Sequence, residues 1–223
     1  MDLQVSAYSS DRKVPLTQAL AQLGLKLSDG YVLFGIDLPS IAEPEVYISI
    51  PDTTSLGGAL AQVISQVPGY TFQAASEHVI DVDPIDIRSV NNDPLNLRIR
   101  HFAVTNEPAM NIFSRPSRFM PELKNYLLRG KTTNACGSLG PGIGSSGPGV
   151  TLNLEGNTVR QILNAVAEAD AKLLEHSENH SVPVGWVHRM SVDPLKGLQD
   201  DWSFLSAVPH GWERFMKEKT KSE

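Results

Sequence analysis

Five side chains in this sequence have chemistry that an enzyme site could use. They are two aspartates and, farther along the chain, three histidines: Asp81, Asp83, His101, His176 and His180. Carboxylates and imidazoles donate and accept protons near neutral pH, and both bind metal ions. If folding brings several of them into one cleft, we expect a small hydrolase-like enzyme whose site lies between two halves of the chain.

The aspartates belong to a short acidic cluster. Asp81, Asp83 and Asp86 together could hold a divalent cation through carboxylate oxygens. Their spacing is not that of a calcium-binding loop, and Val82 and Ile85 alternate with them as in the edge and exit of a strand. We therefore expect exposed acids beside a turn.

Two of the histidines have the spacing of a zinc site. His176 and His180 are four residues apart, which places both imidazoles on one face of a helix. A metalloprotease motif has glutamate directly after the first histidine, but here Ser177 stands in that position. The segment follows a predicted helix and is polar, so we expect a solvated surface rather than a metal site.

A glycine-rich segment at residues 142–147 has the spelling of a dinucleotide-binding motif. Such glycines bind a pyrophosphate only between a strand and the N-terminus of a helix. Residues 131–140 are not predicted as a strand, and Pro148 follows the motif. We predict a flexible loop over residues 137–149 and no nucleotide cofactor.

The remaining reactive residues also favour simple explanations. Cys136 lies in a Gly/Ser-rich stretch without a predicted basic partner, so we expect an inert thiol. Asp200 and Asp201 precede an aromatic stretch and are expected to begin a helix rather than act as paired carboxylates. Arg115 and Arg118 fit a solvated positive patch or a contact for an acidic partner. We accordingly predict no catalytic, metal-binding or cofactor-binding residue and no cofactor.

Composition narrows the class of protein. The chain has 223 residues, a net charge of −6, 41% apolar and 20% charged residues, which is typical of a globular protein. An acidic chain without a basic block binds phosphate backbones poorly, so we expect no nucleic-acid partner. The single cysteine excludes an internal disulfide.

No apolar run reaches the roughly 18 residues of a membrane span. Residues 1–12 lack a signal-peptide core, so we expect a cytoplasmic protein, or a periplasmic or secreted one if a signal was removed.

Three segments share one apolar spacing, i, i+3, i+4, i+7, which predicts amphipathic helices. They are residues 16–23, 56–64 and 159–167. Pro15 and Ser55 suit the N-terminal ends of the first two helices, and Gly24 suits the C-terminal end of the first. A short helix is also predicted over residues 120–128. The predicted strands are residues 3–7, 31–38, 46–50, 70–74, 78–82, 95–99, 151–154 and 184–190.

These elements predict an α+β protein with helices packed on short mixed sheets. We divide it into a β-α-β-β-α-β-β module at residues 1–84, a connector at 85–94 and a second α+β module at 95–200. An aromatic and then charged tail follows at residues 201–223.

The first module resembles the short N-terminal domains of secretins and TonB-dependent transducers. The residues that carry this likeness are 14–23, 31–37, 56–67, 69–72 and 79–82, and a looser likeness covers 150–154 and 158–163. The resemblance implies small β-α-β repeats of bacterial envelope proteins. Because the chain lacks a secretin pore region, pore formation and transport are not carried over.

Together these observations favour a non-catalytic binding or assembly module of the bacterial cell envelope. Exposed strand edges and grooves beside helices would recognise another envelope protein or a peptide. The small enzyme described above is the alternative, and convergence of its acids and histidines in one cleft would distinguish it. The sequence leaves the binding residues and the oligomeric state unknown.

Overall fold

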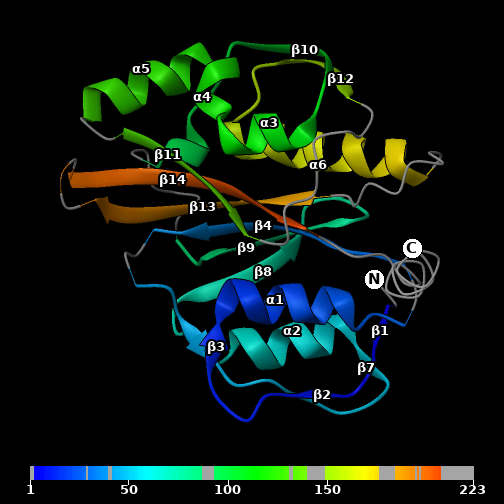
Figure 1. The fold of residues 1–223 in the computed structure, drawn as a ribbon. Helices are drawn as coiled ribbons and strands as arrows, with labels where there is room; N and C mark the ends of the chain where they lie inside the picture. The colour runs from blue at the N-terminus through cyan, green and yellow to red at the C-terminus, as the bar shows by residue number, and fades with distance from the viewer. Residues whose placement is uncertain are drawn as a thin grey trace, which may run out of the picture.

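A computed structural model describes residues 3–28, 30–39, 42–86, 93–130, 133–139, 149–175, 184–193, 195 and 197–206. The chain has an α+β fold, as predicted. A six-stranded sheet lies between two layers of helices (Figure 1). Its strands, in spatial order, are β11 (Thr133–Leu139), β14 (Gly197–Ser206), β13 (Val184–Asp193), β4 (Leu33–Leu38), β9 (Val79–Pro84) and β8 (Tyr70–Ala74).

The sheet joins both halves of the chain. In its centre, β4 pairs in parallel with β9 on one side and with β13 on the other. The strand pair β13–β14 and the hairpin β8–β9 are antiparallel, and β11 is parallel to β14. The predicted connector at residues 85–94 therefore does not separate two sheets. The predicted boundary between residues 200 and 201 lies inside β14.

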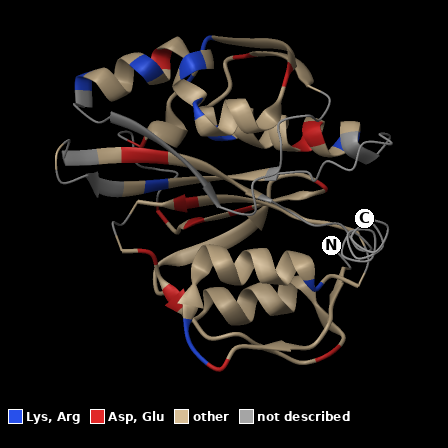
Figure 2. Cartoon of the chain, viewed as in Figure 1, with Lys and Arg blue, Asp and Glu red and all other residues tan. Residues whose placement is uncertain are grey.

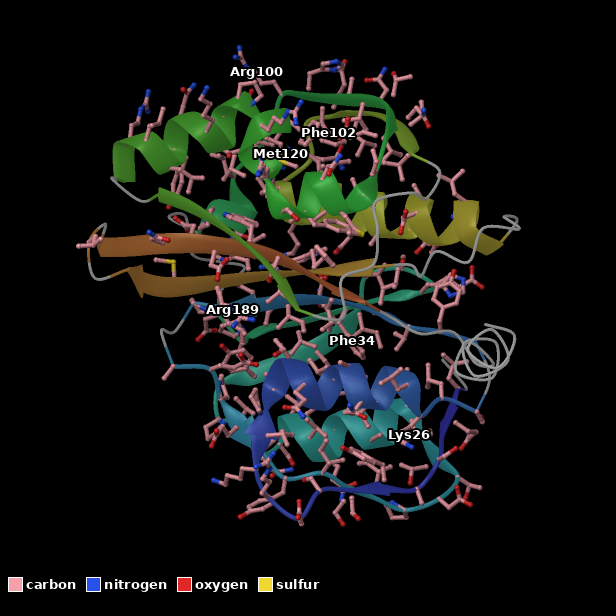
Figure 3. The ribbon with its side chains drawn as sticks, in the orientation of Figure 1. Lys26, Phe34, Arg100, Phe102, Met120 and Arg189 are labelled. Atoms are coloured by element: carbon pink, nitrogen blue, oxygen red, sulfur yellow. The ribbon has the colours of Figure 1, made fainter. Side chains whose placement is uncertain are left out.

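One face of the sheet is covered by the first two predicted helices, which are confirmed as α1 (Leu16–Leu25) and α2 (Leu56–Ile64). Both bury the apolar stripe that their spacing predicts. Ser55 caps α2, since its side chain accepts a hydrogen bond from the Gly58 N–H at 3.2 Å. Figure 3 shows Phe34 of β4 between the sheet and α1, where it joins this core.

The other face carries the third predicted helix, confirmed as α6 (Val159–Glu175), together with α3 (Ala109–Ser114), α4 (Pro116–Phe119) and α5 (Pro121–Gly130). A two-stranded antiparallel sheet of β10 (His101–Glu107) and β12 (Val150–Glu155) lies above them. Trp186 and Trp202 of the large sheet are fully buried in this second core. Phe102 and Met120 join it from the helical side (Figure 3).

The predicted strand at residues 95–99 is wrong. Residues Pro94–Asn96 form a short 3-10 helix, η2, because Pro94 favours a turn and Asp93 caps it. The Asp93 carboxylate accepts a hydrogen bond from the Leu95 N–H at 2.6 Å. Leu95 and Ile99 are both buried, so the alternation of apolar residues reflects burial on an irregular segment rather than a strand.

Other predictions need correction along the second half of the chain. Residues 131–140 were not expected to contain a strand, but β11 lies within them and pairs with β14 over its whole length. Residues 137–139 of the predicted loop form the end of β11 instead. Of the remaining loop residues, only residue 149 belongs to the described part of the chain. Asp200 and Asp201 lie in β14, not at a helix start, because this segment completes the sheet beside β13.

The N-terminal strands are shorter than predicted. Residues 3–7 contain only β1 (Gln4–Val5), and residues 46–50 are divided between β5 (Glu45–Val46) and β6 (Ser49–Ile50). Their partners are β7 (Thr54–Ser55), β3 (Val14–Pro15) and β2 (Tyr8–Ser9), respectively. None of the described helices is long and apolar enough to cross a membrane.

Candidate functional site

Charged side chains gather between the large sheet and α6. Successive strand residues point to opposite faces, so Asp37, Asp83, His188 and Asp200 all lie on the α6 side of the sheet. Arg160 reaches them from α6. We call these five residues the buried polar network. Each is at least 95% buried, and together they link β4, β9, β13 and β14 to one helix.

His188 lies at the centre of this network. Its Nδ1 is 2.9 Å from Asp37 Oδ1, and its Nε2 is 3.0 Å from Asp200 Oδ1. Burial by itself lowers the pKa of the imidazole, but the hydrogen bonds to the two carboxylates outweigh burial and raise the pKa from 6.5 to about 9. The ring is therefore a cation at neutral pH, and both nitrogens donate. The Trp202 ring packs against it at 4.4 Å between centroids.

Arg160 forms the second cationic centre. Its guanidinium pairs with Asp83 through Nη1 and lies 3.5 Å from Asp37 Oδ2 through Nη2. It also lies 5.7 Å from the centroid of the Trp186 ring, within the range of a cation–π interaction. The Asp37 carboxylate thus contacts both cations, His188 through Oδ1 and Arg160 through Oδ2.

A further carboxyl lies near this network at the N-terminal end of η2. Burial raises the pKa of Asp93 to about 6, and the charge of Asp37 adds to the rise, although His188 and Arg160 oppose it. Counting Asp93, four carboxyls share two cations. Burial, with the charge of Asp37 adding to it, explains why a proton binds Asp93 more strongly than usual.

The network is not accessible enough to act as a catalytic site. The side chains of His188 and Asp37 are 1% and 0% exposed, so no substrate atom reaches the imidazole. Both ring nitrogens are already engaged by carboxylates. Its geometry instead suits a structural tie between strands that are distant in the sequence.

A second polar chain leads from the core to an open cavity. Trp186 Nε1 donates to Asn164 Oδ1 at 2.7 Å, and Asn164 Nδ2 donates to the Asp81 carboxylate at 3.0 Å and 3.2 Å. The cavity, of about 420 Å³, lies between α6 and the β8–β9 hairpin. We call it the edge cavity. Its polar lining includes Gln73, Ser76, Asp81, Arg160, Asn164 and Glu168.

The edge cavity adjoins an open strand. Within the described residues, β8 has a single neighbour, β9. The Ile85 N–H donates to the Gly69 carbonyl and the Ala75 N–H donates to the Val79 carbonyl, which fixes the alternation of ladder bonds along the hairpin. By this alternation, the N–H and C=O groups of Phe72 and Ala74 point away from β9.

Within the described residues, Asp83 and Asp200 join the buried polar network, but the acids and the histidine considered for an enzyme site do not meet in one open cleft. Asp81 and Asp83 are both 1% exposed within β9, so the prediction of exposed acids beside a turn is wrong for them. Asp86 is exposed. His101 is exposed on β10, 3.5 Å from Glu155, and His176 and His180 lie outside the described residues.

The other candidates are also dispersed. Cys136 lies in β11, where its backbone pairs with Trp202, and Arg115 and Arg118 are exposed. Among the described residues, no group of three or more His, Cys, Asp or Glu side chains is arranged to hold a metal ion.

No protein-family model, curated protein or solved structure matches this chain. Function is therefore inferred from geometry. Sequence reasoning missed Asp37, Arg160 and His188, which lie on apolar strands and on an amphipathic helix. The only signal was a charged residue at a position that the strand or helix pattern assigns to the core.

Proposed function

We propose that this protein is a non-catalytic binding module of the bacterial cell envelope that captures an extended segment of a partner protein beside β8. The observation that carries this proposal is the edge of β8, which no other strand of the described residues pairs with and along which the backbone groups of Phe72 and Ala74 are directed outward. Such groups hydrogen-bond an incoming strand in the same way as a neighbouring strand in a sheet. The resemblance over residues 3–84 supports the envelope location.

The surroundings of β8 suit a peptide. Thr71, Gln73 and Ala74 are exposed, so the strand is not shielded by its own side chains. Tyr70 and Phe72 are half-buried against the α1 and α2 core and offer an apolar surface on one face. On the other face lies the edge cavity, which is beside α6. A strand added here would have both a backbone ladder and side-chain contacts.

The alternative of a small enzyme receives less support. It depends on acids and histidines meeting in an open cleft, whereas His188 is enclosed between two carboxylates and His101 is remote on β10. Of the acids considered from the sequence, Asp81 alone lines the edge cavity. Without a base or nucleophile beside it, that carboxylate favours binding over reaction.

A single substitution tests the proposal. Ala74→Pro removes the outward N–H and blocks an added strand, yet it breaks no ladder bond to β9 because the Ala74–Ile80 pair is not hydrogen-bonded. Ala74→Ser is the matched control, since it retains the N–H. Both variants should retain the wild-type melting temperature within a few degrees.

The assay captures proteins from a bacterial envelope extract with the whole chain as bait. We expect one or more proteins to be captured by the wild type and by Ala74→Ser, and to be lost with Ala74→Pro. The captured protein is then cut into peptides, and the binding peptide is identified. Equal capture by Ala74→Pro, or capture only of globular surfaces with no binding peptide, would contradict strand addition.

A further inference from the structure

We infer that the edge cavity selects a basic side chain, lysine or arginine, on the captured strand. This inference rests on the proposed function and names the class of segment that β8 takes. It is carried by the position of the cavity relative to the strand edge and by the charges in its wall.

The register of the sheet places one side chain of the added strand at the cavity. Gln73 pairs with Asp81, and both point to the α6 face. A neighbouring strand lies about 4.8 Å away, and its residues alternate between the two faces. The residue opposite Gln73 would therefore point to the α6 side, while the residues before and after it would contact the Phe72 side.

The charges in the cavity wall favour a cation. Asp81 is 1% exposed and Glu168 is partly buried, and both line the cavity. Arg160 also lines it, but its charge is matched by Asp83 and Asp37 outside the cavity. Two carboxylates thus face the cavity, and the nearby cations are Arg160, which pairs with Asp83 and Asp37, and Lys172, which pairs with Glu168. A cation entering here gains from both carboxylates.

Both carboxylates have internal partners that orient them. Asn164 holds Asp81, and the Ser76 hydroxyl donates to Glu168, so both carboxylates are oriented before a ligand arrives. Lys172 lies 3.4 Å from Glu168, but its side chain is 62% exposed. An exposed pair of this kind contributes little to stability, so an incoming basic side chain competes with it at small cost.

A second observation also indicates a ligand. Arg160 is 4% exposed, and among the described residues its Nε finds no hydrogen-bond acceptor. A buried donor without an acceptor is costly, and a carbonyl or water oxygen brought in with a peptide would satisfy it. The cavity, at about 420 Å³, is in the size range of small-ligand sites and holds one long side chain with water.

The charge distribution of the whole chain agrees with a basic ligand. The net charge is −6, and Figure 2 shows acidic residues in the strands of the sheet while lysines and arginines mark α4 and α5. Basic residues also lie beside the edge cavity, where Arg160 and Lys172 of α6 pair with carboxylates. The negative net charge of the chain attracts a basic segment at long range.

The test uses fluorescently labelled octapeptides in which threonine and valine alternate. In each peptide one central threonine is replaced by lysine, norleucine or glutamate. Binding to the full chain is measured by polarisation at physiological salt. We expect the lysine peptide to bind about fivefold more tightly than the norleucine peptide, as for a single exposed ion pair, and the glutamate peptide to bind weakest. Glu168→Gln should narrow the gap between lysine and norleucine, whereas Glu155→Gln, on the distant strand β12, should not.

The outcomes separate this inference from the proposed function. Equal binding of the lysine and norleucine peptides, with loss of both in Ala74→Pro, would overturn the selection of a basic side chain but keep strand addition. Lysine-dependent binding that persists in Ala74→Pro would overturn strand addition at β8. Absence of binding by all three peptides at millimolar concentration would overturn both.

Discussion

The enclosed His188 makes this protein less stable as the pH rises above neutral. Its pKa is about 9 in the folded chain and 6.5 as an ordinary imidazole. A proton therefore binds the folded state more tightly than the unfolded state. The resulting stabilisation is complete below pH 6.5 and disappears as the pH rises through 9.

The size of this effect follows from the difference between the two pKa values. Each pKa unit corresponds to 1.36 kcal/mol, so the protonated imidazole contributes about 3 kcal/mol below pH 6.5. That is a large share of the roughly 5–15 kcal/mol that stabilises a typical domain. We expect the free energy of unfolding to fall by about this amount between pH 6 and pH 10.

The assay is urea unfolding at several pH values, followed by the fluorescence of the buried Trp186 and Trp202. The double variant His188→Asn/Asp200→Asn is the reference, because it removes the titrating ring and the carboxylate at its Nε2 while Asp37 keeps Arg160 as a partner. The pKa of Asp93 responds to the charge of His188 and that of Tyr126 to the charge of Asp200, so the difference between the two proteins reports His188 together with these two couplings.

The wild type should lose about 3 kcal/mol more than the double variant over this range. If the variant fails to fold, an NMR titration of the His188 ring in the wild type replaces it. A ring that titrates near 6.5, or a wild type whose stability is constant or rises from pH 6 to pH 10, would refute a cationic His188 between two carboxylates.

Two further substitutions test the packing and charge around this network. Gly35→Ala should destabilise the fold by about 1–3 kcal/mol, because its new Cβ would lie 2.6 Å from the Trp186 ring, and chemical unfolding measures the loss. Gly57→Ala is the control, because nothing lies within 4 Å of the added Cβ and alanine favours a helix. An equal loss of stability in Gly57→Ala would contradict the packing explanation. Asp93→Asn should raise stability by about 3 kcal/mol at pH 7.5 and leave it unchanged below pH 4, because the raised pKa of Asp93 penalises the folded state only once the carboxyl ionises. A variant less stable than wild type at pH 7.5 would show that the carboxylate is needed as a charge.

Local patterns in the sequence were sufficient for the elements with a regular period. The three helices follow from the i, i+3, i+4, i+7 spacing, and the β8–β9 hairpin follows from two short runs around a turn. The strand pattern failed at residues 95–99, where Asp93 and Pro94 favour a capped turn over an extended backbone. β11 was missed because its residues are small and polar, and it is a strand only by pairing with β14.

The buried polar network could not be predicted, because its contacts cross long stretches of sequence. Asp37 and His188 are 151 residues apart, and Arg160 and Asp83 are 77 apart. Nothing local marks a strand aspartate as the partner of a particular histidine. The open edge of β8 was likewise invisible, since it depends on the order of strands in the sheet.

The most direct test of the account is hydrogen exchange at the backbone of β8, measured by NMR on the full chain with and without the captured peptide. Thr71 and Gln73 lie in hydrogen-bonded pairs with β9, so their amides should be protected in both states. The account predicts that the Phe72 and Ala74 amides exchange quickly in the free protein and become protected when the peptide binds. Protection elsewhere, with Phe72 and Ala74 unchanged, would contradict strand addition at β8.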